Sequence, residues 1–226
     1  MAILYGIGVG PGDKDLITLK AIKILQKVDI VIAPSSKGEE SIAFEIAKPY
    51  INCQVIFMEF PMTYLKQELK QKWQDNINQI KGLLDTGKDV AFITLGDPMI
   101  YSTYIYILKG LKGYKVETIP GITSYSGAAS AANIPIAEGQ APFAVIPSGN
   151  IEDIKKILNI FDNVILMKIT KKYSEIVKLL HEENFTGKLI IKTGHEDEII
   201  SSNFEEYIDT SISYLSLIIA KKVRKD

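Results

Sequence analysis

The chain has 226 residues, of which 46% are hydrophobic and 23% charged, an ordinary globular composition with enough apolar material for a sizeable core. Its 26 basic and 27 acidic residues nearly cancel, and a formal charge of −1 excludes the strongly basic field of a nucleic-acid-binding protein. One cysteine and two histidines give neither an internal disulfide nor zinc-ligand spacing. With no basic leader and no apolar run of about 18 residues, the sequence predicts a cytoplasmic protein that does not enter a membrane.

Short apolar runs alternate with helical periodicity through the first half of the chain. The predicted strands are 2–5, 29–34, 54–60 and 90–95, and the predicted helices are 16–28, 39–50 and 64–85. In the first helix, Leu16, Leu19, Ile22, Leu25 and Val28 repeat every three residues and predict its apolar face. Asp15 or Thr18 is a candidate cap for this helix, and Gly87 follows the third helix where a stop is expected. This alternation predicts a largely parallel sheet with helices on both faces.

The second half has more closely spaced strands. They are predicted at 115–120, 143–149, 163–168, 188–194 and 214–222, with helices at 124–132, 151–161 and 172–183. We therefore expect two α/β domains, residues 1–118 with a mostly parallel sheet and residues 119–226 with a mixed sheet. The boundary is placed where Pro120 and Gly121 interrupt the pattern.

A glycine-rich run, "GIGVGPG" from Gly6 to Gly12, directly follows the first predicted strand. Four glycines in seven residues are costly for an ordinary turn, and they favour close approach of the backbone to a ligand. The dinucleotide pattern GxGxxG fails, because Pro11 and Asp13 stand where its last glycine should be. Pro11 also lacks an N–H group for a phosphate. The run predicts a binding loop for a ligand with no phosphate at that point.

A second motif, "LGDPMIYST" from Leu95 to Thr103, lies between a buried strand and a helix. Open α/β sheets bind their ligands at the carboxyl ends of parallel strands. A plain Gly-Asp-Pro turn is the simpler interpretation. The cluster of Asp97 with Tyr101, Ser102 and Thr103 favours a functional one.

Two further segments follow predicted strands. "PGITS", from Pro120 to Ser124, precedes a helix rich in small residues, and Met167 stands near the end of a later strand. Taken alone, the first is an ordinary capped turn and the second an ordinary core methionine.

Together and in this order, "GVGPGDKDLIT", "GDPMIYS", "PGITS" and the strand-closing methionine resemble the tetrapyrrole methyltransferases of the uroporphyrinogen III and corrin type. The resemblance covers nearly the whole chain. It implies the tetrapyrrole methylase fold, with a cofactor cleft between two domains, and a homodimer. It also implies S-adenosylmethionine as methyl donor, S-adenosylhomocysteine as product and an anionic tetrapyrrole as substrate. Within the family, the segment around "GDPMIYS" looks closest to the branch that methylates carbon 20 of precorrin-2 or cobalt-factor II in cobalamin biosynthesis.

The resemblance also implies site residues. Those carried over as cofactor-binding are Pro11, Leu95, Gly96, Asp97, Ile100, Thr123, Ser124, Met167 and Gly194. Asp97 is the candidate catalytic base, and the competing role for it is to hold the cofactor or the turn. Lys37, Lys66 and Lys70 are candidates for the substrate carboxylates. No residue of the protein is expected to bind a metal ion, and any cobalt would enter with the substrate.

Other functions stay open at this point. They are methylation of another position of a corrin precursor, diphthine-type methylation of a protein, and a non-catalytic ligand-binding regulator of α/β fold. A nucleotide-dependent dehydrogenase is disfavoured by the glycine spacing.

Overall fold

A computed structural model describes residues 2–35, 41–60 and 66–223, without the side chains of residues 66–69. The chain forms two compact units, Met1–Ser124 and Tyr125–Asp226. Each unit has its own five-stranded sheet, and each is described by itself. The domain boundary expected between residues 118 and 119 stays a prediction.

The sheet of the first unit is parallel throughout, and its strand order is β3-β2-β4-β1-β5. Its strands are β1 (Ile3–Gly8), β2 (Ile30–Ser35), β3 (Gln54–Glu59), β4 (Val90–Thr94) and β5 (Lys115–Ile119). The central strand is β4, which lies between β2 and β1, and every residue of β4 is buried. Burial on both faces is what a parallel sheet requires, because its crossover helices cover both sides.

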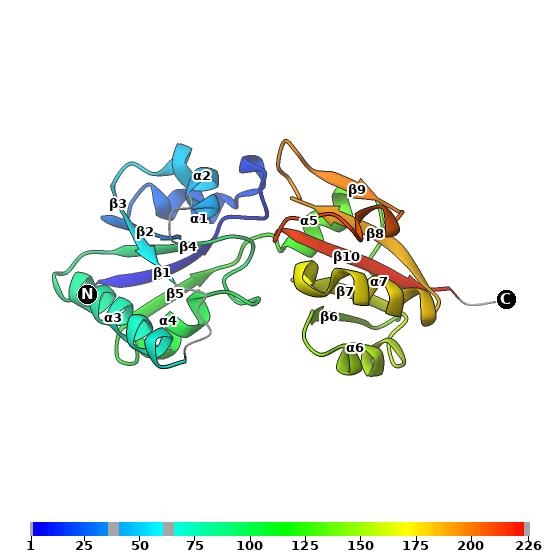
Figure 1. Ribbon diagram of the computed structural model, residues 1–226. Coiled ribbons are helices and arrows are strands. Elements are labelled where there is room, and N and C mark those ends of the chain that lie inside the picture. Colours follow the sequence, from blue (N-terminus) through cyan, green and yellow to red (C-terminus); the bar gives the residue numbers. More distant parts are fainter. Residues whose placement is uncertain (1, 36–40, 61–65, 224–226) are drawn as a thin grey trace. The chain divides into compact units, whose positions relative to one another are not determined.

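Helices lie on both faces of this sheet (Figure 1), and neighbouring strand residues belong to different cores. Ile7 and Ile93 lie in the core under α1 (Leu19–Leu25) and α2 (Ile42–Ala47). Leu4 and Phe92 lie in the core under α3 (Lys66–Asp85) and α4 (Tyr104–Gly110). This period of two sends successive strand side chains to opposite faces of the sheet. The predicted parallel sheet with helices on both faces is confirmed.

The start of α1 differs from the predicted apolar face. A short 3₁₀ helix, η1 (Lys14–Leu16), comes first, and the Thr18 hydroxyl then caps α1 by accepting a hydrogen bond from the Ala21 N–H at 3.2 Å. Because α1 is this short, its buried side is set by Ala21 and Leu25 at a spacing of four, whereas Leu19 is 74% exposed. The period-three face was therefore wrong at Leu19.

The first strand also runs further than predicted, from Ile3 to Gly8. Its glycines do not end it, because two of them lie inside the strand where neighbours press on the backbone. A Cβ atom at Gly6 would lie 2.1 Å from the Tyr104 ring. The glycine run is thus partly strand and partly loop.

The second unit has a mixed sheet with the order β6-β7-β10-β8-β9, in which only β6 and β7 pair in parallel. Its strands are β6 (Phe143–Pro147), β7 (Asn163–Met167), β8 (Phe185–Ile191), β9 (Ile199–Ser201) and β10 (Ser216–Lys222). The prediction of a mixed sheet is confirmed. Strand β9 was missed, because it has three residues and two of them are exposed, which leaves no alternation to read.

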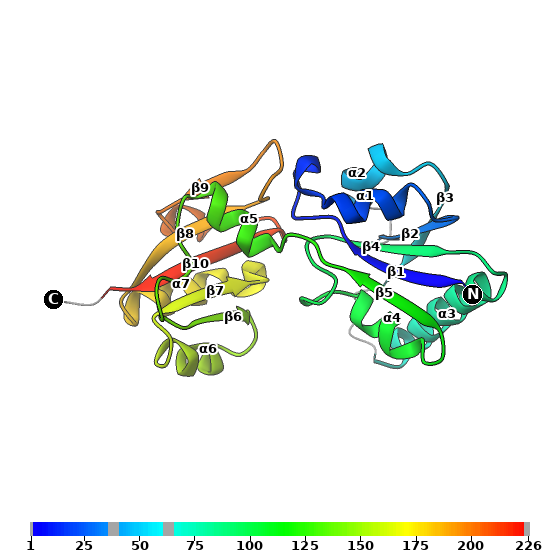
Figure 2. The same cartoon turned by 180° about the vertical axis from the view of Figure 1, so that it is seen from behind.

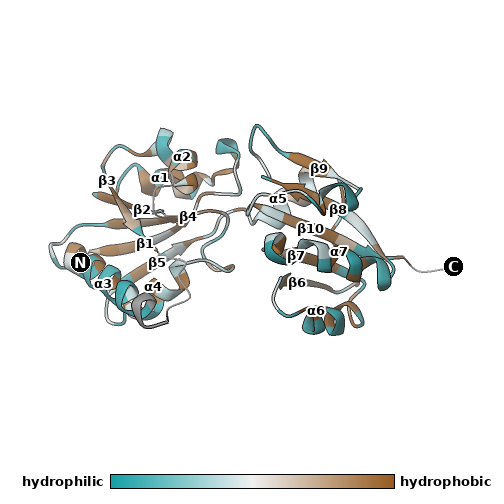
Figure 3. Ribbon diagram, viewed as in Figure 1, coloured by the Kyte–Doolittle hydropathy of each residue, from teal (hydrophilic) through white to brown (hydrophobic). Residues whose placement is uncertain are grey.

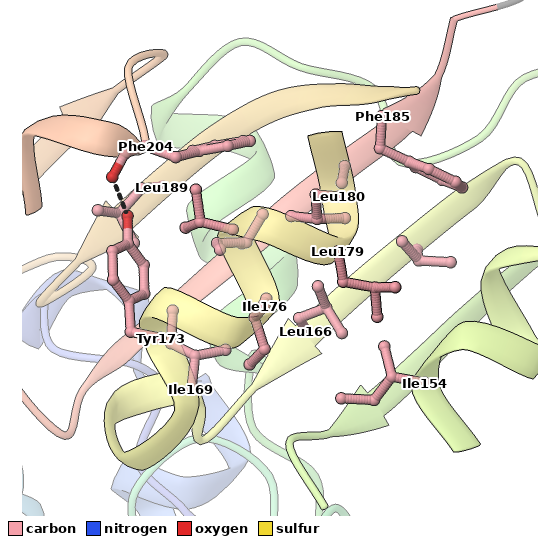
Figure 4. Close-up of a cluster of buried hydrophobic side chains, with 14 of the residues drawn as sticks. Ile154, Leu166, Ile169, Tyr173, Ile176, Leu179, Leu180, Phe185, Leu189 and Phe204 are labelled. Carbon is pink, nitrogen blue, oxygen red and sulfur yellow. Dashed lines mark hydrogen bonds between the residues drawn. The ribbon is translucent and has the colours of Figure 1, made fainter. Parts of the chain in front are cut away.

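Helices cover both faces of this second sheet. Helix α5 (Ser124–Ala131) packs on one face, where Figure 2 shows it in front of the strands. Helices α6 (Ile151–Leu158) and α7 (Tyr173–Glu182) cover the other face and enclose the core drawn in Figure 4. Hydrophobic colour marks much of the strands in both units, whereas the helices mix hydrophobic and hydrophilic residues (Figure 3).

Three more 3₁₀ turns complete the described elements: η2 (Lys48–Tyr50), η3 (Ile169–Lys172) and η4 (Glu205–Tyr207). Over the residues that the structure describes, no helix combines the length and the apolar character needed to cross a bilayer.

Candidate functional site

Three loops leave the same edge of the first sheet. Residues 9–12 follow β1, residues 95–103 follow β4, and residues 120–123 follow β5. Because the strands are parallel and adjacent, their carboxyl ends lie together, which is where open α/β sheets bind ligands. All three loops belong to motifs recognised in the sequence.

Backbone hydrogen bonds join the glycine-rich loop to the Gly-Asp-Pro loop. The Val9 N–H donates to the Thr94 carbonyl at 3.0 Å. Gly10 and Gly96 exchange two bonds in an antiparallel bridge, at 3.3 Å and 2.7 Å. Gly10 and Gly96 have φ values of +84° and +68°, in the left-handed region that glycine enters without strain. The pair therefore extends the contact between β1 and β4 by one bridge beyond the sheet.

The Asp97 carboxylate joins the second loop to the third. Its Oδ1 accepts from the Met99 N–H at 2.8 Å, and its Oδ2 accepts from the Gly121 N–H at 3.0 Å. The side chain is half-buried. Charge-assisted bonds of this kind are stronger than neutral ones, so Asp97 acts as a clamp between two loops.

Two glycines let these backbones touch. A Cβ atom at Gly121 would lie 2.2 Å from the Gly96 carbonyl oxygen, and one at Gly8 would lie 2.6 Å from the Gly121 nitrogen. No side chain fits at such distances, and the obstacles are backbone atoms that cannot rotate away. Glycine at positions 8 and 121 is therefore a condition for the three loops to meet.

Hydrogen bonds between hydroxyl groups connect the strands and the start of α4 next to these loops. The Thr94 and Ser102 hydroxyls hydrogen-bond each other at 2.9 Å, and the Ser102 Oγ also accepts from the Tyr104 N–H at 3.1 Å. The Tyr104 hydroxyl in turn bonds the Thr118 hydroxyl at 2.9 Å. Burial raises the pKa of Tyr104, so its hydroxyl stays protonated as a hydrogen-bonding group.

Of these four hydroxyl residues, the sequence pointed only to Ser102. The signal for Thr94 was a lone hydroxyl at the end of the otherwise apolar strand "VAFIT". Nothing local distinguishes Tyr104, whose ring is fully buried over Gly6.

Within residues 9–12, 95–103 and 120–123 the single charge is that of Asp97, and Asp13 and Lys14 come directly after the first of these loops. An anionic phosphate would find no cation here, whereas a cationic group would find one carboxylate. Leu95 and Ile100 add apolar surface beside it, and Ile100 is 38% exposed. This donor set suits a nucleoside that carries positive charge and no phosphate.

Seven of the nine predicted cofactor residues belong to the joined loops or to the residue that follows them. They are Pro11, Leu95, Gly96, Asp97, Ile100, Thr123 and Ser124. Pro11 and Gly96 are buried, and Thr123 and Ser124 are half-buried. The structure thus brings together residues from three separated motifs, and their contacts with a cofactor stay a prediction.

The other two, Met167 and Gly194, lie in the second unit. Met167 ends β7, where its carbonyl accepts from the Ser148 N–H at 2.7 Å. Gly194 has φ +76° in the turn after β8, and its N–H donates to the Glu198 carboxylate at 2.7 Å. Met167 is the last residue of β7 and Gly194 follows β8, and these two strands flank β10 and end at the same edge of the sheet.

A charged pair, Lys192 and Asp197, lies in the same turn as Gly194. The hydrogen bond from Lys192 lowers the pKa of Asp197. His195 follows Gly194, and its buried Nε2 atom has no hydrogen-bond partner within residues 2–35, 41–60 and 66–223.

Of the three lysines predicted to bind the substrate carboxylates, the structure describes the side chain of Lys70 alone. Lys37 lies outside the described residues, as does the side chain of Lys66, and Lys70 is exposed on α3. In the described part of the chain, no three or more His, Cys, Asp or Glu side chains gather as they would around a metal ion.

Comparison with known proteins identifies relatives of the whole chain. Residues 3–194 match the family model described as Tetrapyrrole (Corrin/Porphyrin) Methylases. The chain is 38% identical over 232 residues to the probable cobalt-precorrin-2 C(20)-methyltransferase of Methanocaldococcus jannaschii, covering 98% of this chain and 97% of that protein. It is 36% identical over 182 residues to the cobalt-precorrin-2 C(20)-methyltransferase of Salmonella typhimurium, covering 78% and 77%.

Solved structures agree on the fold. A cobalt precorrin-4 methyltransferase superposes with a TM-score of 0.75 at 23% identity, covering 97% of this chain and 94% of that one. A uroporphyrin-III C-methyltransferase from Thermus thermophilus, complexed with S-adenosylhomocysteine, gives 0.72 at 19% identity, covering 97% of both chains.

Proposed function

Because the chain belongs to the tetrapyrrole (corrin/porphyrin) methylase family, we propose that it transfers a methyl group from S-adenosylmethionine to carbon 20 of precorrin-2 or its cobalt form, cobalt-factor II. The choice of carbon rests on the names of its two relatives above, which match it over most of their length. The observation that carries the proposal is the meeting of three motif loops at one sheet edge, joined by Gly10, Gly96, Asp97 and Gly121. The reaction belongs to cobalamin biosynthesis.

The residues present fit the proposed cofactor. S-adenosylmethionine supplies an electrophilic methyl group on a positively charged sulfonium. The loops offer one carboxylate, backbone polar groups and the apolar side chains of Leu95 and Ile100, with no cation that would repel it. Pro11, Gly96, Asp97, Thr123 and Ser124 would hold it in the first unit. For Met167 and Gly194, which belong to the second unit, a role in cofactor binding stays a prediction.

Positioning should contribute more to the rate than proton transfer. Alignment of two reactants supplies roughly 7–11 kcal/mol. General-base help is worth about 10²–10⁴-fold, or roughly 3–5 kcal/mol. The protein therefore needs rigid loops above all, and the interlocked backbones of the three loops provide them.

Asp97 fits the positioning role better than the base role. Both of its oxygens already accept backbone N–H groups, and these two bonds join the second loop to the third. A base role stays a prediction. The enzyme is further proposed to be a homodimer in the cytoplasm.

Product analysis tests the function. The purified protein is incubated with S-adenosylmethionine and either precorrin-2 or cobalt-factor II, products are weighed by mass spectrometry, and NMR locates the added carbon. We expect one methyl group at carbon 20. A methyl group at another carbon would assign the enzyme to a different step. Calorimetric heat with S-adenosylhomocysteine but no methylated product would indicate a non-catalytic binding protein, and no heat at all would overturn the cofactor assignment.

A further inference from the structure

The turn between Asp97 and Ser102 is fixed at both ends. At its start, the Asp97 carboxylate accepts from the Met99 N–H, and the Asp97 carbonyl accepts from the Ile100 N–H at 3.3 Å. At its end, the Ser102 hydroxyl is buried between Thr94 and the start of α4. These hydrogen bonds hold both ends of the turn in place.

One residue of this turn, Tyr101, has a strained backbone. Tyr101 has a φ of +50°, in the left-handed region, which costs a non-glycine residue roughly 1–2 kcal/mol. Asparagine occupies two of the other four non-glycine positions of this kind and tolerates the region better, whereas a bulky aromatic residue is an unusual choice. Strain that the surroundings enforce is typical of ligand-binding segments.

The same turn exposes three consecutive large apolar side chains. Met99 is 51% exposed, Ile100 38% and Tyr101 45%. Single exposed apolar residues are ordinary, but a run of three on a solvent-facing turn is costly unless something covers it. Ile100 is already proposed to contact the cofactor, which leaves Met99 and Tyr101 on either side of it.

We propose that Met99 and Tyr101 form an apolar ledge against which one face of the tetrapyrrole ring lies, and that this ledge selects the carbon presented for methylation. The inference rests on the proposed function and names residues that bind its substrate. A thioether and an aromatic ring are suited to the flat π-face of a macrocycle.

Charge also favours this occupant. A tetrapyrrole with many carboxylates is repelled by an exposed carboxylate. The one carboxylate in this loop, that of Asp97, is neutralised in part by two backbone N–H groups. Met99 and Tyr101 carry no charge, so they can contact the apolar ring face without repelling the carboxylates at the rim of the ring.

The test separates binding of the ring from binding of the cofactor. Cobalt-factor II is titrated by absorbance in the presence of S-adenosylhomocysteine, which prevents turnover, and S-adenosylhomocysteine is titrated alone by calorimetry. The variants are Met99→Gln, which keeps length but adds a polar group, and Tyr101→Asn, which tolerates the positive φ and therefore preserves the fold. Ile160→Asn is the matched control, since Ile160 is 71% exposed just beyond α6 in the second unit.

Each ledge variant should raise the Kd for cobalt-factor II about tenfold, which corresponds to ~1.4 kcal/mol. The Kd for S-adenosylhomocysteine should change less than about twofold, and Ile160→Asn should match the wild type in both titrations. With S-adenosylmethionine added, the ledge variants should give methylated isomers that the wild type does not form.

Three results would overturn the ledge: unchanged affinity for cobalt-factor II in both variants, equal weakening of both ligands, or a change of oligomeric state, which would assign the surface to a second copy of the chain. Failure of the proposed function is distinguishable, because wild-type protein would then bind the ring without methylating it.

Discussion

The carboxyl edge of the first sheet and the core of the second unit are stabilised in different ways. At the edge, three loops meet through backbone atoms, with glycine at the points of closest approach and Asp97 as the clamp. In the core under α6 and α7, apolar side chains interlock and a single buried hydroxyl, that of Tyr173, needs a partner (Figure 4). The edge therefore depends on individual atoms, whereas the core depends on total apolar volume.

This difference predicts how each region responds to mutation. Large-to-small changes in a core cost free energy in proportion to the volume lost, and volume-conserving changes are tolerated. An added atom at a backbone contact has no such graded response, because a loop must move. The largest effects on activity should come from the edge, and the core should show smaller effects on stability.

Gly121→Ala should give the largest effect. Its Cβ would lie 2.2 Å from the Gly96 carbonyl oxygen and 2.8 Å from Gly8 atoms, so the third loop must leave the other two. A misplacement of about 1 Å at a reacting site costs on the order of 10²-fold in rate. We expect at least that loss in kcat/KM, measured by transfer of labelled methyl groups.

Gly82→Ala is the control for this substitution. Gly82 lies exposed within α3, where a Cβ atom would meet nothing within 4 Å. Alanine there should leave activity unchanged and stabilise the protein by roughly 0.5–1 kcal/mol. If Gly121→Ala kept wild-type activity, the three loops would not need to touch for function.

Asp97→Asn tests the clamp against the base role. The amide nitrogen cannot accept a hydrogen bond, so one of the two N–H groups, of Met99 or Gly121, loses its partner. Leaving such a bond unmade costs roughly 1–3 kcal/mol. We expect the affinity for S-adenosylhomocysteine and the turnover rate to fall together, each by about tenfold or more.

The two measurements must be made on the same protein sample. Calorimetry gives the Kd for S-adenosylhomocysteine, and single-turnover methyl transfer at saturating cofactor gives the rate. Wild-type cofactor affinity with lost turnover would instead support Asp97 as the base.

Local sequence pattern was sufficient for the architecture and for much of this edge. Buried runs such as "VAFIT" predicted the parallel strands, and parallel strands place the loops after them side by side. Gly96, Asp97 and Gly121 could be recognised because turn chemistry restricts them to few residue types.

What the sequence did not reveal depends on contacts between distant residues. Glycine is required at position 6 of β1 because the ring of Tyr104 lies over it, and the two residues are far apart in the chain. The Thr94–Ser102 bond likewise joins the end of β4 to a residue two positions before α4. Strand β9 and the exposed Leu19 were missed because short elements contain too few residues for a period to be read.

The smallest effect is expected in the core, at Tyr173. Its hydroxyl donates to the Phe204 carbonyl at 2.8 Å, and burial, together with Tyr207, raises the pKa of Tyr173 from 10.0 to about 12. Tyr173→Phe should cost about 1 kcal/mol at pH 7, since the Phe204 carbonyl loses its donor. The rest of the side chain keeps its packing.

The pH dependence has a definite sign. A raised pKa in the folded state favours the protonated form, so this contribution is fully present below pH 10 and is lost as the pH rises from about 10 to about 12. Urea unfolding at pH 7, 10 and 11 should therefore show wild-type stability declining above pH 10, and Tyr173→Phe should decline less. Tyr106→Phe is the control, because Tyr106 is 57% exposed on α4. If the free energy of unfolding fell as steeply above pH 10 in Tyr173→Phe as in the wild type, ionisation of the Tyr173 hydroxyl would not be the cause of the decline.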